Sequence, residues 1–224
     1  SRVNGKQTSN VTRYANMFSI FFNYFTEAQK QEVKKSVLMN NKIPKITTPY
    51  MRFYELEALC AMGEQKYVLN QMKDYWGGML KLGATTFWEE YDPDKKGADN
   101  YSMYGREFGK SLCHAWGASP IYLLGKYYLG VKPTAPGYSR YTVEPKLGGL
   151  QWMEGSVPTP NGDIHVRCDT KEIKVSAQTG TGILHFTSKT LPVCKEGSVV
   201  AKGKNVYEIS IAKGKQYTVS YTAI

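Results

Sequence analysis

The spacing of apolar residues changes near residue 130, and no other feature of the sequence constrains the fold as much. Before this point apolar side chains recur every three or four residues, which predicts amphipathic helices. After it they alternate with polar side chains, which predicts short strands of a half-buried sheet. Gly130, Pro133, Pro136 and Gly137 mark the junction. We therefore expect helices over 1–132 and a small antiparallel β-sandwich over 133–224.

The helical part has recognisable helix starts. Thr26 and Gln29 fit a capping box, and Thr48 followed by Pro49 fits the start of a further helix that ends at Gly63. Another helix is expected from Glu64 until two glycines loosen it. A last helical region is expected from His114 to Gly130, with a kink or a restart at Pro120. Five aromatic side chains are expected on one face of the first helix: Tyr14, Phe18, Phe21, Phe22 and Phe25.

The second part contains several short alternating segments separated by glycine-rich turns, such as 161–163, 179–182, 202–204 and 213–215. This spacing favours an antiparallel sandwich over a parallel sheet. Tyr207, Tyr217 and Tyr221 alternate with polar residues, so they are expected to face the core.

Composition places the chain among ordinary globular proteins, with 42% hydrophobic and 21% charged residues in 224. No apolar run is long enough to span a membrane, and the first residues lack the apolar stretch of a secretory signal. The net charge of +10 is spread over both parts, which favours solvated surfaces over a nucleic-acid site. We expect neither a membrane nor a nucleic-acid partner.

The four cysteines and three histidines do not occur at metal-ligand spacing, so no metal site and no cofactor are expected. Four buried thiols are the simplest interpretation. A bridge between Cys168 and Cys194 stays open for an oxidising compartment.

The segment 83–92 fits neither a helix nor a strand, and it combines small, aromatic and acidic residues. Glu89 beside Trp88 in such a loop could be a catalytic carboxylate beside a platform for a sugar ring. The alternative is that Trp88 anchors the loop on the core while Glu89 and Glu90 are solvated. His114 could bind a hydroxyl group or be a satisfied core histidine.

Two further motifs favour ordinary local structure. Residues 92–97 start like a calcium loop but lack the later acidic ligands, so a turn is expected. Asn10 starts a glycosylation triplet at a place where it can simply cap a helix.

Several short sequence motifs occur in an order that resembles the C-terminal portion of bacterial α-L-rhamnosidases of glycoside hydrolase family 78. They cover most of 48–165: Gly-Ala-Thr-Thr-Phe-Trp-Glu (83–89), Ser-Leu-Cys-His-Ala-Trp (111–116), Tyr-Leu-Leu (122–124), Gly-Val-Lys-Pro (130–133), Pro-Gly-Tyr (136–138), Glu-Pro (144–145) and Gly-Ser-Val-Pro-Thr-Pro-Asn-Gly (155–162). The resemblance implies part of an (α/α)₆ barrel of six helical hairpins followed by a β-sandwich. This agrees with the change of period.

The resemblance also implies a reaction and its residues. The family inverts anomeric configuration, which requires an acid at the leaving oxygen and a base that activates water. It implies that Glu89 is the general base, that Trp88 belongs to its loop, and that His114 contacts rhamnose, although Cys113 stands where many relatives carry Asn. In the family the general acid lies in an upstream sequence motif that contains acidic residues and Trp. This motif is absent from residues 1–82.

Such a chain would be the second half of a barrel. We then expect it to need the missing N-terminal half as a partner, to be inactive alone, and to expose inner side chains such as Phe18, Phe22, Phe53 and Trp76. The substrate implied is a rhamnose-containing glycoside or polysaccharide, and the resemblance favours a periplasmic or extracellular location. Two other functions stay open: a different six-hairpin glycosidase or polysaccharide lyase, and a carbohydrate-binding fragment without catalysis.

Overall fold

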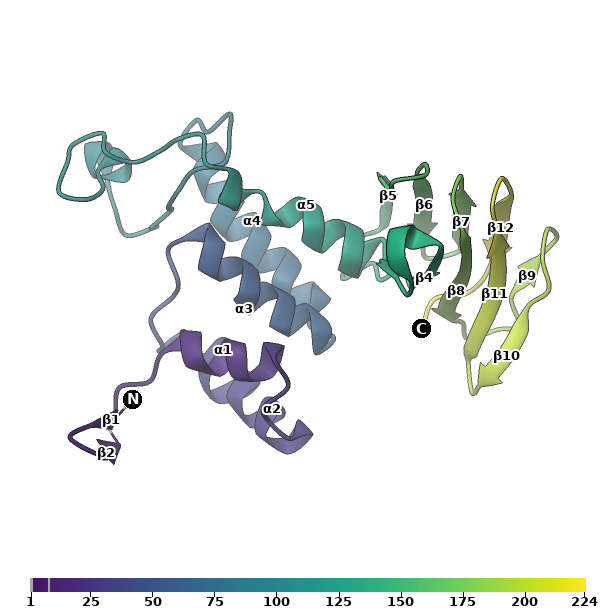
Figure 1. Ribbon diagram of the computed structural model, residues 1–224, viewed down its shortest axis with the longest axis horizontal. Coiled ribbons are helices and arrows are strands. Elements are labelled where there is room, and N and C mark those ends of the chain that lie inside the picture. Colours follow the sequence, from purple (N-terminus) through teal and green to yellow (C-terminus); the bar gives the residue numbers. More distant parts are fainter. Residues whose placement is uncertain (1, 8) are drawn as a thin grey trace. The chain divides into compact units, whose positions relative to one another are not determined.

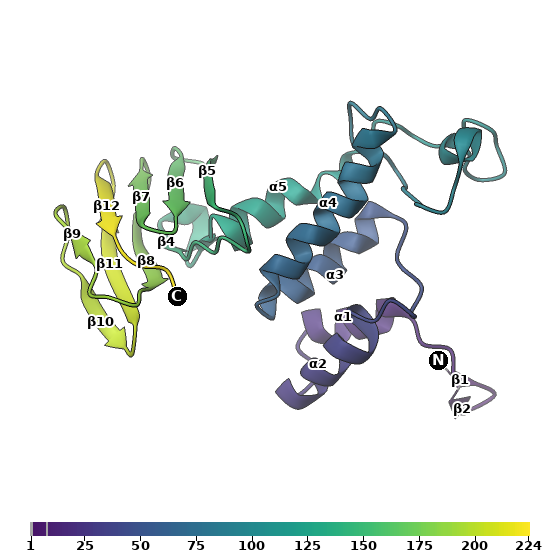
Figure 2. The ribbon, with the colours of Figure 1, turned by 180° about the vertical axis from the view of Figure 1, so that it is seen from behind.

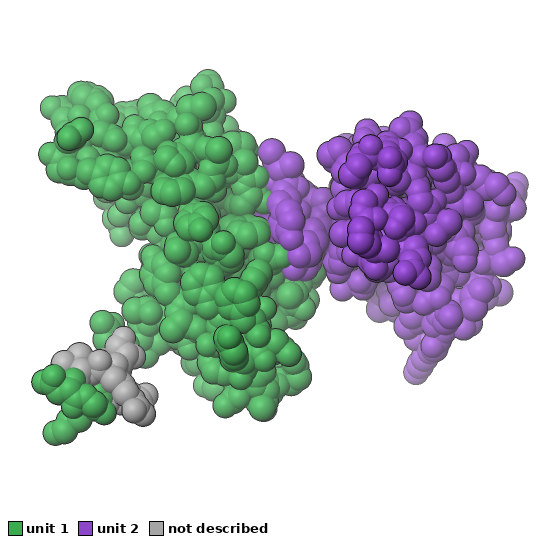
Figure 3. All heavy atoms as spheres, in the orientation of Figure 1, with its two compact units in different colours: residues 1–120 green, residues 121–224 purple. Residues whose placement is uncertain are grey.

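The computed structural model describes residues 2–7 and 9–224, which form two compact units divided between Pro120 and Ile121 (Figure 3). The first unit is mainly helical and the second consists mainly of strands, so the expected order of helices before strands is confirmed (Figure 1). The strand Val131–Pro133 (β3) belongs to the second unit and pairs with β4 (Arg140–Val143). The division of domains after residue 132 stays a prediction about independent folding.

The helical unit contains two helical pairs. The helices are α1 (Arg13–Phe21), α2 (Glu27–Val33), α3 (Pro49–Ala61), α4 (Gln65–Lys81) and α5 (Ser119–Leu123), the last of which crosses the division between the units. A wider, π-helical turn extends α2 over Lys34–Leu38 and α5 over Leu124–Tyr128. Helices α3 and α4 lie side by side in both views (Figure 1, Figure 2). A small hairpin, β1 (Arg2–Val3) with β2 (Lys6–Gln7), precedes them.

Local sequence chemistry explains where the helices begin and end. The capping box of Thr26 and Gln29 is confirmed, with the Thr26 hydroxyl accepting from the Gln29 N–H and the Gln29 side chain accepting from the Thr26 N–H. Thr48 and Pro49 start α3 as expected. Gly63 follows the end of α3 with φ of 86°, a backbone conformation that residues with a Cβ rarely adopt.

Helix α1 packs on a face other than the one that carries its aromatic residues. Its buried side chains are Arg13, Met17 and Ile20, whereas Phe22, just beyond its end, is 57% exposed. The guanidinium of Arg13 determines this orientation, because it donates to Glu55 Oε1 at 2.5 Å and to four backbone carbonyls of the following loop: Leu38, Asn40, Ile43 and Pro44. A buried charge needs all of these partners, so they hold that face of α1 inward.

Helix α4 continues through Gly77 and Gly78 instead of loosening there. A Cβ on Gly78 would lie 2.3 Å from the ring of Tyr91, whereas a Cβ on Gly77 would meet no atom within 4 Å. Tyr91 is held in place by a hydrogen bond from its backbone N–H to the Thr47 carbonyl and by its edge-to-face contact with Tyr75. Gly78 therefore makes room for the loop that returns over α4.

This difference predicts opposite effects for two neighbouring glycines. Gly77→Ala should stabilise the helical unit by about 0.5–1 kcal/mol, because alanine favours the helix and meets no obstacle. Gly78→Ala should destabilise it by about 1–3 kcal/mol, because the Tyr91 ring must move. Urea unfolding followed by circular dichroism measures both variants. Equal effects of the two substitutions would show that Tyr91 does not pack on Gly78.

Two five-stranded sheets form the core of the second unit. Their orders are β10-β11-β8-β4-β3 and β5-β6-β7-β12-β9, and every neighbouring pair is antiparallel except β4 with β8, which is parallel. The remaining strands are β5 (Trp152–Val157), β6 (Ile164–Asp169), β7 (Glu172–Ala177), β8 (Thr181–Thr187), β9 (Val193–Cys194), β10 (Val200–Gly203), β11 (Val206–Ala212) and β12 (Gln216–Ser220). Alternate residues are buried, as in Ile164, Val166 and Cys168.

Of the three tyrosines of the alternating pattern, Tyr217 is buried, and Tyr207 and Tyr221 are half-buried. Tyr217 is 4% exposed, and the Tyr221 hydroxyl donates to the Asp169 carbonyl at 2.7 Å. Tyr207 stacks on Phe186 with the ring centres 6.0 Å apart. These contacts support the expectation of a core-facing side chain for Tyr217.

The cysteines differ from expectation in two respects. Cys113 is exposed and Cys194 is half-buried, so the prediction of four buried thiols is wrong for these two. The structure also contradicts a bridge between Cys168 and Cys194: both thiols are free, and strands β7 and β12 lie between β6 and β9. With about 4.8 Å between neighbouring strands, the two α-carbons are much farther apart than the roughly 7 Å a disulfide allows.

Candidate active site

The predicted catalytic loop is held by backbone pairing with a segment more than twenty residues later in the chain. The Glu89 N–H donates to the Ser111 carbonyl at 2.9 Å, and the His114 N–H donates to the Phe87 carbonyl at 2.7 Å. These bonds place Glu89 and His114 on adjoining stretches of backbone. The structure thus brings together two of the three predicted site residues.

The carboxylate of Glu89 is nearly buried and receives two hydrogen bonds. The residue is 6% exposed; the Tyr104 hydroxyl donates to Oε1 at 2.6 Å and the Ser111 N–H donates to Oε2 at 3.0 Å. The bond from Tyr104, more than any other contact, lowers the pKa of Glu89, and the bond from Ser111 acts in the same direction, while burial opposes both. Glu89 is therefore ionised at neutral pH, the state that a general base requires.

His114 lies beside this carboxylate, with Nδ1 3.9 Å from Glu89 Oε2 and 30% of its side chain exposed. Its backbone is extended and precedes the 3₁₀ turn Ala115–Gly117, so it stands before a helical turn and not within a helix as expected. The ring packs on Trp116, with 4.1 Å between the ring centres. An accessible imidazole next to an ionised carboxylate is suited to binding a hydroxyl group.

Trp116 and Tyr50 continue this group as a row of rings that was not predicted. Their ring centres are 5.4 Å apart at an angle of 22°, and the side chains are 38% and 41% exposed. Tyr50 lies in the first turn of α3, sixty-six residues from Trp116, so no local sequence pattern could have joined them. These partly exposed aromatic side chains, next to His114, offer apolar surface against which a sugar ring can pack.

Trp88 is 3% exposed, and its ring contacts Tyr101 and lies 5.9 Å from Lys110 Nζ. These contacts support the role of an anchor that fixes the loop on the core. A direct contact between Trp88 and substrate stays a prediction.

Glu90 differs sharply from its neighbour. Its Oε2 lies 2.7 Å from Lys95 Nζ and 3.3 Å from Lys110 Nζ, and Lys110 is itself buried. Glu90 is thus paired with two ammonium groups, whereas Glu89 is held by a phenol and an amide. The two adjacent carboxylates therefore differ in their direct partners.

The Asp92 side chain accepts from the Asp94 N–H at 3.0 Å, as expected for an ordinary turn. Among residues 2–7 and 9–224, no group of three or more His, Cys, Asp or Glu side chains is placed to hold a metal ion. No helix in the same ranges is both long enough and apolar enough to cross a membrane.

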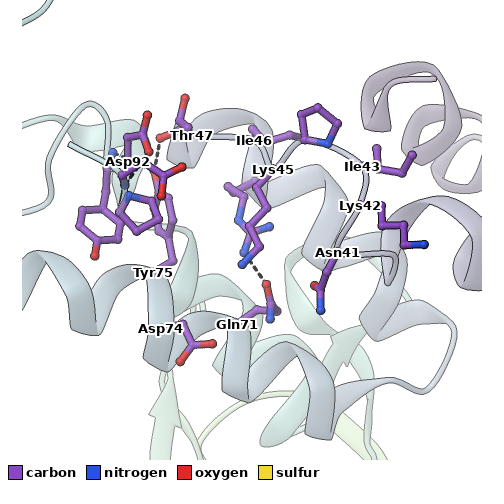
Figure 4. A pocket seen from close by; sticks show the side chains of 15 residues that line it. Asn41, Lys42, Ile43, Lys45, Ile46, Thr47, Gln71, Asp74, Tyr75 and Asp92 are labelled. Carbon is purple, nitrogen blue, oxygen red and sulfur yellow. Dashed lines mark hydrogen bonds between the residues drawn. The ribbon is translucent and has the colours of Figure 1, made fainter. Parts of the chain in front are cut away.

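A separate cavity of about 680 Å³ lies in the helical unit, between the loop 41–47, helices α3 and α4, and residues 91–94 (Figure 4). Its wall includes Gln71, Asp74 and Asp92 (Figure 4), but neither Trp88, Glu89 nor His114. The predicted site residues therefore do not line this cavity.

Helices followed by two packed sheets agree with the architecture of six-hairpin glycosidases that the sequence resemblance implies. Comparison with known families is more specific: residues 3–128 match the bacterial alpha-L-rhamnosidase 6 hairpin glycosidase domain, and residues 130–180 match the bacterial alpha-L-rhamnosidase C-terminal domain. The chain belongs to the bacterial α-L-rhamnosidase family.

Individual relatives agree with this family. The chain is 35% identical to an alpha-L-rhamnosidase of Alteromonas sp. (strain LOR) over 96 residues, which cover 41% of this chain and 10% of that protein. It is similar to the crystal structure of a GH78 rhamnosidase of Bacillus sp. GL1, with a TM-score of 0.61 and 28% identity, covering 77% of this chain and 17% of that one.

Two more distant structures share the fold. The alpha-L-rhamnosidase of Dictyoglumus thermophilum has a TM-score of 0.72 at 18% identity, over 95% of this chain and 25% of that one. The Streptomyces avermitilis enzyme, complexed with L-rhamnose, has a TM-score of 0.60 at 14% identity, over 96% and 22%. The chain thus spans a tenth to a quarter of the length of these relatives.

Proposed function

We propose that this chain is the part of an inverting α-L-rhamnosidase that carries the general base, Glu89. The observation that carries the proposal is the state of this side chain: a nearly buried, ionised carboxylate, held by two donors, inside the segment that matches the six-hairpin family. In the reaction the base removes a proton from a water molecule that attacks the anomeric carbon, and the sugar is released with inverted configuration.

The residues around Glu89 divide the remaining tasks. His114 hydrogen-bonds a hydroxyl of the rhamnose, and Trp116 and Tyr50 present their faces to the ring of the sugar. Trp88 anchors the loop and thereby keeps Glu89 in place. The substrate is a rhamnose-containing glycoside or polysaccharide.

The general acid comes from a part of the enzyme outside these residues. Inverting glycosidases place two carboxyl groups about 6.5–9.5 Å apart on opposite sides of the sugar. Glu90 is paired with Lys95 and Lys110, and it is adjacent to Glu89 in the chain. The missing N-terminal half of the barrel, the partner expected from the family, supplies the acid and covers the exposed Phe22. Trp76 needs no such cover, because it is buried and its indole N–H donates to the Gly117 carbonyl at 2.8 Å.

This proposal predicts that the isolated 224-residue chain does not hydrolyse an aryl α-L-rhamnoside, because the base alone cannot complete a reaction that also needs an acid. A longer polypeptide with the N-terminal half of the barrel should hydrolyse it. The release of the aryl alcohol, measured for both proteins at equal concentration, checks this. Turnover by the isolated chain at the rate of the longer protein would contradict the proposal, and an aryl glycoside of another sugar, used as substrate by the longer protein, would favour a different six-hairpin enzyme.

A further inference from the structure

Tyr104 combines an exposed ring with a hydrogen bond to a buried carboxylate. The residue is 71% exposed, yet its hydroxyl donates to Glu89 Oε1 at 2.6 Å. A ring so exposed gains little from the hydrophobic effect, so core packing does not explain its position. The hydrogen bond to Glu89 explains the position of Tyr104.

The turn that carries Tyr104 supports this interpretation. Met103 and Arg106 exchange two backbone hydrogen bonds of 3.1 and 3.0 Å, and the two residues between them, Tyr104 and Gly105, have φ of 55° and 71°. Positive φ at both central positions defines a tight turn in which Asn-Gly or Asp-Gly is preferred. A tyrosine in the first of these positions is unfavourable for the backbone, and such strain is retained where the side chain has a task.

The end of the same loop, at Lys110 and Ser111, is also fixed next to Glu89. The Lys110 N–H donates to the Tyr101 carbonyl at 3.0 Å, and the next residue, Ser111, donates to the other oxygen of Glu89. The two carboxylate oxygens of Glu89 therefore accept hydrogen bonds from the tip and from the end of one loop. A carboxylate has about four lone-pair directions, so two donors leave room for a water molecule.

The groups that face Glu89 favour its ionised form unequally. Besides Tyr104 and Ser111 they are His114, 3.9 Å away, and the Lys110 ammonium, which also pairs with Glu90. The hydrogen bond that lowers the pKa of Glu89 also raises the pKa of Tyr104, because the carboxylate stabilises the protonated phenol.

We propose that Tyr104 is a positioning residue for the general base: the turn 103–106 holds its hydroxyl against Oε1 and thereby fixes the orientation of the Glu89 carboxylate. The inference rests on the proposed function of Glu89, but its test does not. Tyr104 acts through Glu89 and takes no part in bond making.

The test is an NMR titration of the Glu89 carboxyl carbon in the 224-residue chain. In Tyr104→Phe the midpoint of this titration should move to higher pH, because the lost hydrogen bond no longer favours the carboxylate. Tyr101→Phe is the matched control: it removes a hydroxyl from the same loop that does not hydrogen-bond to Glu89, and it should leave the midpoint unchanged. An unchanged midpoint in Tyr104→Phe, or an equal shift in both variants, would overturn the proposal.

Glu89→Gln tests the same pair from the other side and does not depend on the folding of Tyr104→Phe. Titration of the phenol carbon of Tyr104 should then move to lower pH, because the carboxylate that holds the proton on the phenol is gone. An unchanged Tyr104 titration would also overturn the proposal. Neither titration measures hydrolysis, so they can succeed even if Glu89 is not the base, and they can fail even if it is.

Discussion

Glu89→Gln, made in a full-length rhamnosidase that contains this chain, should lower kcat by about 10²–10⁴-fold with a modest change in KM. Glutamine keeps the size of the side chain, and its single oxygen can still accept the hydrogen bond of either Tyr104 or Ser111, but it cannot take a proton from water. Because the base acts mainly in the transition state, the loss falls on kcat. The initial rate of hydrolysis of an aryl α-L-rhamnoside, measured over a range of substrate concentrations, separates kcat from KM.

Glu90→Gln is the matched control for this prediction. The two residues are adjacent, but Glu90 is paired with Lys95 and Lys110, so its substitution should affect kcat far less than that of Glu89. A larger loss in Glu90→Gln than in Glu89→Gln would move the catalytic role to the other carboxylate. Near-normal kcat in both variants would show that the general base does not lie in this loop.

The second large effect concerns the stability of the helical unit. Glu55 is 1% exposed, and its two oxygens accept from Arg13 at 2.5 Å and from Arg52 at 2.6 Å. Glu55→Ala would leave two buried guanidinium groups without their shared anion, and removing one partner of a buried ion pair costs about 3–5 kcal/mol. For a unit of this size we expect the melting temperature to fall by about 10–20 °C.

Glu27→Gln is a suitable control, because it removes a carboxylate that is also paired, with Lys30 at 2.6 Å, but 81% exposed. It should cost at most about 1 kcal/mol. Thermal unfolding followed by circular dichroism at the helical wavelength compares the two variants. If Glu55→Ala were no more destabilising than Glu27→Gln, the buried network would not hold α1 and the following loop on α3.

This network also shows where sequence reasoning failed. In the first helix the spacing predicted an aromatic face, but it did not predict the face that is buried, which carries Arg13, Met17 and Ile20. An arginine is normally read as a surface residue. Its partner Glu55 is forty-two residues away, and no local pattern indicates that the two will meet.

Features that depend on neighbouring residues were predicted more successfully. The capping box at Thr26, the start of α3 at Thr48 and Pro49, and the alternation of β6 and β7 follow from short-range chemistry, and all were confirmed. The parallel pairing of β4 with β8 was missed, because it depends on which strands meet across the sheet.

The candidate site was predicted in part for the same reason. Glu89, Trp88 and His114 lie in sequence motifs that resemble the family, as does Trp116, two residues after His114. Tyr104 and Tyr50 join the site through a tight turn and a long-range contact. A tyrosine at the tip of a tight turn carries no recognisable motif. Its approach to Glu89 could be found only from the three-dimensional structure.

Chemical rescue tests the role of Glu89 most directly. In Glu89→Ala of the full-length enzyme, azide can enter the space left by the carboxylate and attack the anomeric carbon without the help of a base. The bond from the anomeric carbon to the aryloxy oxygen breaks, and the general acid protonates that oxygen. If Glu89 activates water in an inverting reaction, added azide should restore release of the aryl alcohol and yield β-L-rhamnosyl azide from the α-linked substrate. An α-configured azide, or hydrolysis by Glu89→Ala at the unsubstituted rate without azide, would contradict the account.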